Sequence, residues 1–155
     1  MATLVPLIRP ADPSEYDEIA RLWMDSWTST GIEAPSDRLL SRLSQRLRNE
    51  IEKGWSLLVA DDDGRLAAML ALHIPRLYLD QLFVSPTYQG KSIGRQLLAH
   101  ARRLLPDEIW LRCVRENSRA WEWYEREGFR LEKEELEPRT GFMMKYYRWK
   151  KETHS

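Results

Sequence analysis

The sequence predicts a single α/β domain in which helices alternate with the strands of one mixed sheet. Its 155 residues suit one domain with a substantial core. Segments with apolar residues at helical spacing alternate with short apolar runs typical of buried strands. The run at residues 77–84 leads through a glycine-containing loop directly into a helical segment. Helices that alternate with strands in this way pack as layers around a sheet.

The first elements expected are a strand at Leu4–Arg9 and two helices. Residues 12–15 (Asp-Pro-Ser-Glu) form an N-terminal capping pattern, with a proline in the first helical turn and a returning glutamate. A loop is expected at Thr28–Pro35, and Gly54 ends the second helix. One face of each helix carries its apolar residues, which are Tyr16, Ile19, Ala20, Trp23 and Trp27 in the first and Leu39, Leu40, Leu43, Leu47 and Ile51 in the second.

The remaining elements alternate between strands and helices. A turn at residues 61–64 joins two strands as a hairpin. Ser85-Pro86 ends the fourth strand, and Pro106 ends the third helix. The last two strands pair as an acidic strand against a basic one. The expected strands are Trp55–Ala60, Arg65–His73, Leu77–Val84, Ile109–Val114, Phe129–Leu136 and Gly141–Lys150, with one helix from Ile93 to Leu105 and another that starts at Asn117.

The loop at residues 89–94, Gln-Gly-Lys-Ser-Ile-Gly, has the features of a phosphate-binding site. A strand, a glycine loop and a helix N-terminus bring unpaired backbone N–H groups and the positive end of the helix dipole to one point. The spacing excludes a Walker A loop, because Ser85 stands where the first glycine is required. It also excludes the G-x-G-x-x-G dinucleotide fingerprint, because Ser92 and Arg95 occupy glycine positions.

Two motifs resemble those of the GNAT acetyltransferase superfamily. The loop resembles the pyrophosphate-binding pattern Q/R-G-x-G-x-G/A, with Ser92 where the family usually has glycine. Residues 117–129, NSRAWEWYEREGF, resemble the pattern N-x-x-A-x-x-(F/Y)-Y-E-x-x-G-F. The resemblance covers residues 77–131 and implies a mixed, mostly antiparallel sheet, about four helices and a V-shaped opening between the fourth and fifth strands. Residues 1–76 would then form the acceptor side, 77–131 the acyl-CoA core and 132–155 a C-terminal hairpin and tail.

The resemblance implies acetyl-CoA, or a close acyl-CoA, as co-substrate. The pantetheine arm would pair with the backbone of the fourth strand, and the pyrophosphate would lie on the loop's N–H groups. A backbone N–H near Val84 would polarise the thioester oxygen. Lys91 and Arg95 either add charge at the phosphates or are solvated loop cations. The expected cofactor-binding residues are Leu82, Phe83, Val84, Gln89, Gly90, Lys91, Ser92, Ile93, Gly94, Arg95, Asn117, Ala120 and Tyr124.

Transfer of an acetyl group to an amine requires a base for the ammonium and an acid for the departing thiolate. Tyr124 matches the family's acid position, although a tyrosine on an amphipathic helix also suits core packing. Asp80 is the one acid in the fourth strand, where an ionised carboxylate needs a partner or a role. It is either a base or water-holder, or an ion pair with Arg112, which stands where some relatives carry a glutamate. Some relatives use a water chain instead. Asn117 is expected to cap its helix.

The acceptor amine is not identified by the sequence. Trp23, Trp27 and Tyr78 are candidates for an aromatic acceptor pocket, although Trp23 also fits the helix core. An amino acid, polyamine, aminoglycoside or protein remains possible as acceptor. Another class also remains open, a catalytically silent acyl-CoA-binding sensor or interaction module.

Composition excludes several other classes. Equal numbers of basic and acidic residues, 24 each, give no global attraction to nucleic acid or anionic lipid. Only the basic aromatic stretch at residues 145–151 suggests nucleic-acid binding, and it fits an edge strand better. The scattered histidines His73, His100 and His154 predict no metal site. We expect a cytoplasmic protein, because the sequence has no apolar run as long as a membrane span, no evident signal peptide and a single cysteine, Cys113. It is expected to be a monomer or homodimer.

Overall fold

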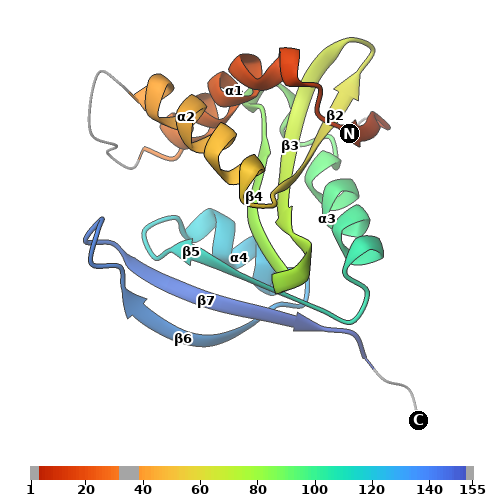
Figure 1. The fold of residues 1–155 in the computed structure, drawn as a ribbon. Coiled ribbons are helices and arrows are strands. Elements are labelled where there is room, and N and C mark those ends of the chain that lie inside the picture. The colour runs from red at the N-terminus through yellow and green to blue at the C-terminus, as the bar shows by residue number, and fades with distance from the viewer. Residues whose placement is uncertain (1–3, 32–38, 153–155) are drawn as a thin grey trace.

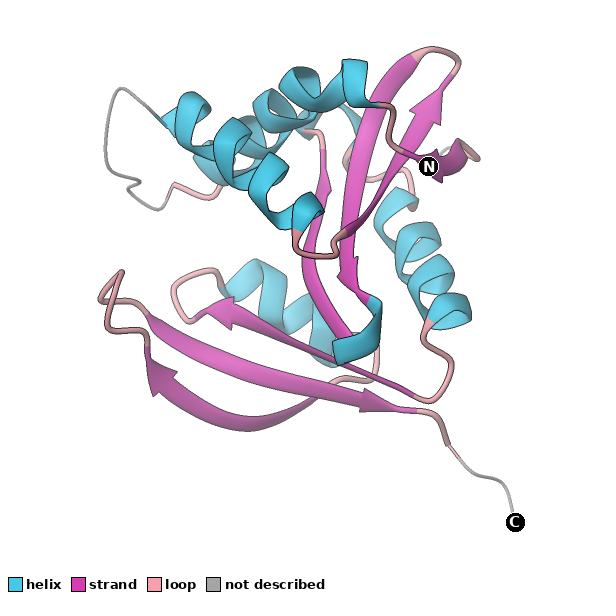
Figure 2. Ribbon diagram, in the orientation of Figure 1, coloured by secondary structure: helices cyan, strands magenta, loops and turns pink. Residues whose placement is uncertain are grey.

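The computed structural model describes residues 4–31 and 39–152 and has a mixed sheet with helices on both faces (Figures 1 and 2). Four α-helices lie in these ranges: α1 (Tyr16–Ser29), α2 (Leu39–Glu52), α3 (Ile93–Leu104) and α4 (Ser118–Arg126). Single 3₁₀ turns occupy residues 13–15, 74–76 and 86–88. The seven strands are β1 (Leu7–Pro10), β2 (Ser56–Asp62), β3 (Arg65–His73), β4 (Tyr78–Val84), β5 (Glu108–Val114), β6 (Arg130–Leu136) and β7 (Met143–Lys150).

The sheet has the strand order β1-β2-β3-β4-β5-β7-β6. Neighbouring strands in the described chain are antiparallel except for β4 and β5, which are parallel. These two strands share a single register pair, Tyr78 opposite Trp110, supported by a hydrogen bond from the Trp110 N–H to the Leu77 carbonyl. Beyond this point β4 and β5 separate. The expected mixed sheet that opens between the fourth and fifth strands is therefore confirmed.

Each face of the sheet packs against its own pair of helices. On one face, Ile19 and Trp23 of α1 and Leu47 of α2 pack on Val59 and Met69 of the central strands. The opposite face packs against α3 and α4 through a second core, which includes Leu70, Leu97, Ile109, Tyr124 and Tyr147. Alternate side chains of β2 and β3 enter the two cores, as the period of a strand requires.

Most element boundaries differ from those expected by one or two residues, and the start of β1 differs by three. β1 starts at Leu7 rather than Leu4, because Pro6 has no N–H to donate and the chain before it contacts the loop ahead of α3 instead. There the Leu4 N–H bonds to the Lys91 carbonyl, and Gln96 donates to the Leu4 carbonyl. α1 continues to Ser29, so the expected loop starts later than Thr28; residues 32–35 of that loop lie outside the described residues.

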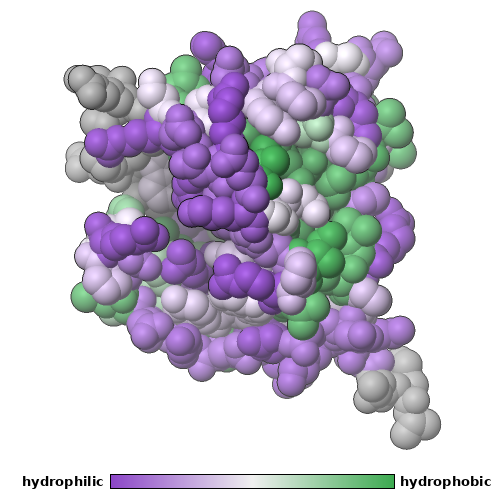
Figure 3. Space-filling model, in the orientation of Figure 1, coloured by the Kyte–Doolittle hydropathy of each residue, from purple (hydrophilic) through white to green (hydrophobic). Residues whose placement is uncertain are grey.

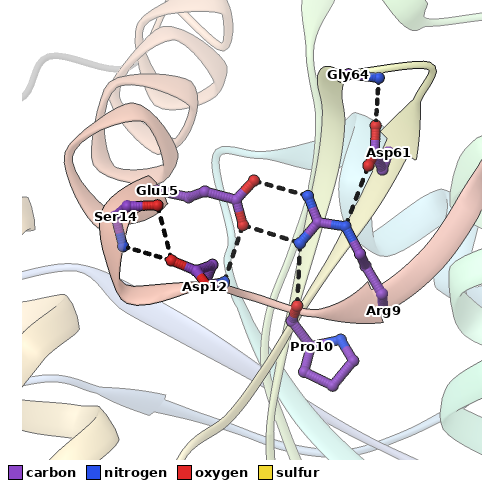
Figure 4. A network of polar contacts seen from close by, with 7 residues as sticks. All are labelled: Arg9, Pro10, Asp12, Ser14, Glu15, Asp61 and Gly64. Atoms are coloured by element: carbon purple, nitrogen blue, oxygen red, sulfur yellow. Dashed lines mark hydrogen bonds and ion pairs between the residues drawn. The ribbon is translucent and has the colours of Figure 1, made fainter.

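A polar network fixes the entry to α1 (Figure 4). The Arg9 guanidinium donates to both carboxylate oxygens of Glu15, at 2.9 and 2.7 Å, and to Asp61 at 3.1 Å. Glu15 also accepts from the Asp12 N–H, which completes the expected capping box. The network joins β1 to the start of α1 and to the β2–β3 hairpin, so α1 is attached to the sheet edge.

Candidate functional site

The opening between β4 and β5 contains two adjoining cavities. The first has a volume of about 570 Å³ and is lined by the end of β4, the loop before α3, the start of α4 and the end of α1. The second, of about 470 Å³, lies between α1, α2, β4, β5 and the β6–β7 hairpin. Both volumes fall in the range typical of small-molecule sites. Leu82, Phe83, Asn117, Ala120 and Tyr124 line both cavities.

The loop before α3 has the backbone geometry of an anion-binding site. Gly90 has a φ of 80°, and Ser92, the residue before α3, has a φ of 64°. The second value is the left-handed conformation that glycine adopts most readily, so Ser92 retains it at some backbone strain. A Cβ at Gly94 would lie 3.5 Å from the Trp123 ring, which is an ordinary van der Waals contact. Ser92, Ile93, Gly94 and Arg95 line the first cavity, so the cavity borders the N-terminus of α3, where the first N–H groups have no partner within the helix.

Tyr124 lies where the two cavities meet. Its side chain is held by the rings of Trp123 and Phe129, whose centroids lie 4.9 and 5.4 Å from its own. Only 7% of the residue is exposed, and burial raises the pKa of the Tyr124 hydroxyl well above its ordinary value of 10.0. The phenol therefore stays protonated throughout the physiological range and can donate a proton.

Asp80 lies in the wall of the second cavity within a polar cluster. Its Oδ2 accepts a hydrogen bond from Trp55 Nε1 at 2.9 Å, and its Oδ1 accepts from Gln81 at 3.1 Å and lies 3.7 Å from an Arg46 nitrogen. His73 Nε2 lies 4.0 Å from Asp80 and 3.3 Å from Glu50. The expected alternative pair with Arg112 is wrong, because Arg112 bonds to Glu137 at 3.3 Å. The partners of Asp80 come instead from α2 (Arg46), from β4 (Gln81) and from Trp55, the residue before β2.

Glu50, His73 and Asp80 also have ligand-type atoms within 4.8 Å of one another. His73 is buried and the two carboxylates are partly buried. The hydrogen bond between His73 and Glu50 and the donors around Asp80 account for these groups without an ion. The expectation of no metal remains a prediction.

The second cavity collects the aromatic residues expected on the acceptor side. Trp23, Trp27 and Tyr78 all line it, together with Phe83 and Phe142. Trp23 is also a core residue, packed between Trp55 and Phe83 at centroid distances of 5.9 and 6.2 Å. Trp27 lies edge-on to Phe142 at 6.3 Å. Burial raises the pKa of Tyr78 to about 12.

The structure brings together most of the residues expected to bind the cofactor. Lys91 is the exception, since it does not line the first cavity, whereas Arg95 does. Asn117 precedes α4 as expected, but its side chain makes no capping hydrogen bond, which contradicts that part of the expectation. The expected residues that line the first cavity are Leu82, Phe83, Val84, Gln89, Gly90, Ser92, Ile93, Gly94, Arg95, Asn117, Ala120 and Tyr124.

Several lining residues were not expected from the sequence. Ser26 of α1 donates to the Val84 carbonyl at 3.3 Å and lines the first cavity. Arg42 and Arg46 of α2 and Glu137 after β6 line the second. The spacing of four residues between the two arginines places them on one helix face. The polar face of an amphipathic helix ordinarily faces solvent. The spacing of Arg42 and Arg46 therefore could not be distinguished, in the sequence, from ordinary surface charge.

Comparisons with known proteins agree with this arrangement. The sequence profile of the acetyltransferase (GNAT) family matches residues 16–129. The PaiA N-acetyltransferase of Thermoplasma acidophilum in complex with coenzyme A is similar at 24% identity and a TM-score of 0.76, with 96% of this chain and 100% of that chain covered. The solution structure of the apo form of YjaB from Escherichia coli is similar at 21% identity and a TM-score of 0.77, with 94% of this chain and 98% of that chain covered.

A further similar structure is that of yncA from Salmonella typhimurium with its cofactor acetyl-CoA, at 17% identity and a TM-score of 0.66, with 97% of this chain and 96% of that chain covered. At these identities the structures establish the fold. No curated protein matches the sequence. In the described part of the chain, no helix is both long and apolar enough to cross a bilayer. The family profile spans well over half of the sequence, and the chain therefore belongs to the acetyltransferase (GNAT) family.

Proposed function

We propose that the protein is an acetyl-CoA-dependent N-acetyltransferase that moves an acetyl group to a primary amine by direct attack on the thioester. The observation that carries the proposal is the meeting of the two cavities at Tyr124. One cavity is lined by the glycine loop before α3, and the other by Asp80 among aromatic rings. A thioester at their junction would be accessible to an amine from the second cavity. The free, buried thiol of Cys113 favours the reducing cytoplasm as the compartment of the protein. The proposed oligomeric state is a monomer or homodimer.

Acetyl-CoA would occupy the first cavity. The pyrophosphate would lie on the N–H groups of the loop from Gln89 to Arg95, where the helix dipole of α3 favours negative charge. The pantetheine arm would pair with the edge of β4 that β5 leaves open beyond Tyr78. The Asn117 side chain, which makes no capping bond, remains available to the arm.

Two proton transfers would complete the reaction. Asp80 would attract the acceptor ammonium and take its proton directly or through a water, which releases the lone pair for attack. Tyr124 would protonate the departing CoA thiolate, and because burial raises the pKa of its phenol the proton is present at neutral pH. The two groups line the same cavity.

Binding and turnover are tested separately. Thermal denaturation should show stabilisation by acetyl-CoA at sub-millimolar levels, because a ligand that binds the folded state stabilises it by mass action. Nicotinamide dinucleotides serve as the control and should give no comparable shift. Thiol release from acetyl-CoA is then measured across a panel of amines, with acylated products identified by intact mass.

The outcomes separate the proposal from its alternative. Thiol release with a matching acetylated amine supports the enzyme. Stabilisation by acyl-CoA without turnover on any amine would favour a silent acyl-CoA-binding module. Absence of a thermal shift with every acyl-CoA tested would overturn both.

A further inference from the structure

The charged groups of the second cavity indicate what kind of amine it accepts. Its described lining includes two carboxylates, Asp80 and Glu137, and three arginines, Arg42, Arg46 and Arg112. A ligand must satisfy the groups that the protein itself leaves unpaired, because buried polar groups without partners are costly. The number of donors and acceptors already used within the protein therefore constrains the ligand.

The carboxylates of the cavity are largely engaged by protein donors. Glu137 accepts hydrogen bonds from Arg112 at 3.3 Å and from the Arg139 backbone N–H at 3.0 Å, and it forms an ion pair with the Arg139 side chain at 3.7 Å. Asp80 receives Trp55, Gln81 and the more distant Arg46. A carboxylate offers about four acceptor positions. Among the described residues, only Trp55 and Gln81 are within hydrogen-bond distance of Asp80, since Arg46 and His73 lie at 3.7 and 4.0 Å. Asp80 therefore retains room for one ammonium group, and Glu137 retains little.

The arginines of α2, by contrast, have donors to spare. A guanidinium presents several N–H donors in a fixed fork. Arg46 has an ion-pair contact to Asp80 at 3.7 Å, and its guanidinium stacks over the Trp23 ring at 5.2 Å, which leaves most of its N–H groups unused. Arg42 lies one helical turn earlier and lines the same cavity. Figure 3 shows polar residues over this part of α2 and over the β6–β7 hairpin below it.

We propose that the acceptor is an α-amino acid with an apolar or aromatic side chain, an inference that rests on the proposed N-acetyltransferase function. The ammonium group would lie against Asp80 and the carboxylate against Arg46, with Arg42 adding charge. In an α-amino acid the ammonium and the carboxylate are attached to the same carbon, so they can lie side by side against Asp80 and Arg46, whose oxygen and nitrogen are 3.7 Å apart. The side chain would lie among Trp27, Phe142 and the other rings of the cavity.

The chemistry balances with these groups alone. The ammonium gives a proton to Asp80, and the free amine nitrogen then attacks the thioester carbonyl carbon. A C–N bond forms, the C–S bond breaks and the thiolate takes a proton from Tyr124. The new amide nitrogen loses its second proton, which returns through water to the Tyr124 phenolate and restores the acid. The products are an N-acetylamino acid and CoA, with the proton on Asp80 released to water.

Three acceptors with the same ring test the substrate class: L-phenylalanine, L-phenylalanine amide and 2-phenylethylamine. The amide replaces the carboxylate by a neutral group of similar size, and 2-phenylethylamine removes it. We expect kcat/KM for L-phenylalanine to exceed that for either neutral compound by about tenfold or more, since charge-assisted bidentate contacts are strong. The amide is the stricter control, because its amine is less basic and is deprotonated more easily.

Matched variants identify the arginine that binds the carboxylate of the acceptor. Arg46→Gln should reduce the preference for L-phenylalanine over 2-phenylethylamine about tenfold, and Arg42→Gln should reduce it by a smaller factor. Arg48→Gln is the control, because Arg48 lies on the same helix but pairs with Asp17 outside the cavity. If Arg46→Gln acted only by disturbing Asp80, both acceptors would lose the same factor and the preference would survive, which would contradict the proposal.

Failure of this inference is distinguishable from failure of the proposed function. Acetylation of 2-phenylethylamine or of a polyamine such as spermidine at rates equal to or above those of L-phenylalanine would overturn the amino-acid acceptor and leave the N-acetyltransferase intact. Binding of acetyl-CoA without acetylation of any amine would overturn the proposed function itself, and with it this inference.

Discussion

Tyr78 and Trp110 lie opposite each other where β4 and β5 meet, and their rings stack with centroids 4.0 Å apart. The Trp110 indole also donates to the Arg76 carbonyl at 2.9 Å. Since β4 and β5 share no other register pair in the described chain, this stack closes the narrow end of the opening. The two cavities lie beyond it, so the geometry of the site depends on the stability of this contact.

Replacement of Trp110 should destabilise the fold at this point. Trp110→Ala removes a half-buried stacked ring, and we expect the free energy of unfolding to fall by about 2–3 kcal/mol, below the loss for a fully buried tryptophan. Trp110→Phe retains a ring and should lose clearly less. Urea denaturation measures both variants. Equal stability of the alanine variant and the wild type would show that the stack does not hold β4 and β5 together.

The sequence predicted the elements well because their signals are local. The 3–4 spacing in α1 and the apolar run of β4 are visible without tertiary information, and the two motifs that resemble the GNAT family are continuous in the chain. The β1 boundary was wrong because contacts of Leu4 with Lys91, distant in sequence, remove that segment from the sheet. Such a contact leaves no periodic pattern.

The acceptor side was predicted less completely because its residues come from separate parts of the chain. Asp80 was found as an unpaired acid in a strand, but its partners Trp55 and Arg46 depend on how α2 rotates against the sheet. Glu137 follows the end of β6, and its contact with Arg112 depends on the β5–β7 register. Helical periodicity does not specify these packing angles.

The loop before α3 is predicted to tolerate one glycine substitution and reject another. Ser92→Gly relieves the left-handed conformation of a residue with φ 64°, so unfolding stability should rise by up to about 1 kcal/mol and CoA should bind as well or better. Gly90→Val places a β-branched residue at φ 80°, which strains the loop and crowds the approach of the pyrophosphate. CoA affinity should fall by about tenfold or more, as measured by calorimetry.

Gly64→Val provides the control for general strain. Gly64 has a φ of 93°, and a Cβ added there would meet open space, as it would at Gly90. Gly64 lies in the β2–β3 turn, however, and lines neither cavity. This variant should lose stability and keep its CoA affinity. Loss of CoA binding on Ser92→Gly would show that the hydroxyl, rather than the backbone, makes the essential contact.

The Arg9 network should make stability depend on pH. Hydrogen bonds from Arg9 lower the pKa of the Glu15 carboxyl, and bonds from the Gly64 N–H and Arg9 lower that of Asp61. A depressed carboxyl pKa contributes stability that is complete above the unfolded-state pKa, about 4, and is lost as pH falls through the folded-state value. Arg9→Gln should therefore lower the melting temperature at pH 7, and the difference from wild type should shrink below about pH 4.

Calorimetric scans from pH 3 to 8 give this comparison, and Arg130→Gln, on the exposed edge strand β6, is the control. A melting-temperature difference for Arg9→Gln that stays constant across the whole range would mean that Arg9 acts through packing of its stem rather than through the carboxylates.

Asp80→Asn tests the proposed base. Without a base, attack depends on the fraction of acceptor that is already neutral, and this fraction is smallest at low pH. The rate should therefore drop most at low pH, by about 100-fold, and recover toward wild type as pH rises. Asp63→Asn, in the exposed β2–β3 turn, is the control. A loss by the same factor at every pH would indicate that Asp80 orients the acceptor and that a water chain removes the proton.

Tyr124→Phe tests the proposed acid with the least change in packing. The ring contacts with Trp123 and Phe129 remain, and only the proton donor is removed. We expect kcat to fall by roughly 10–1000-fold, with little change in acetyl-CoA affinity. The effect should shrink at high pH, because the thiolate then leaves without protonation. Since burial raises the pKa of Tyr124 well above 10.0, ionisation of the wild-type phenol should give no falling limb below that pH.

A pH–rate profile of both enzymes with one confirmed acceptor decides the role of Tyr124. Tyr16→Phe is the matched control, because Tyr16 lies at the start of α1 and lines neither cavity. It should retain wild-type turnover. If Tyr124→Phe also turned over at the wild-type rate across the whole range, the hydroxyl would have no part in the reaction. Tyr124 would then serve only to pack between Trp123 and Phe129, and water would protonate the thiolate.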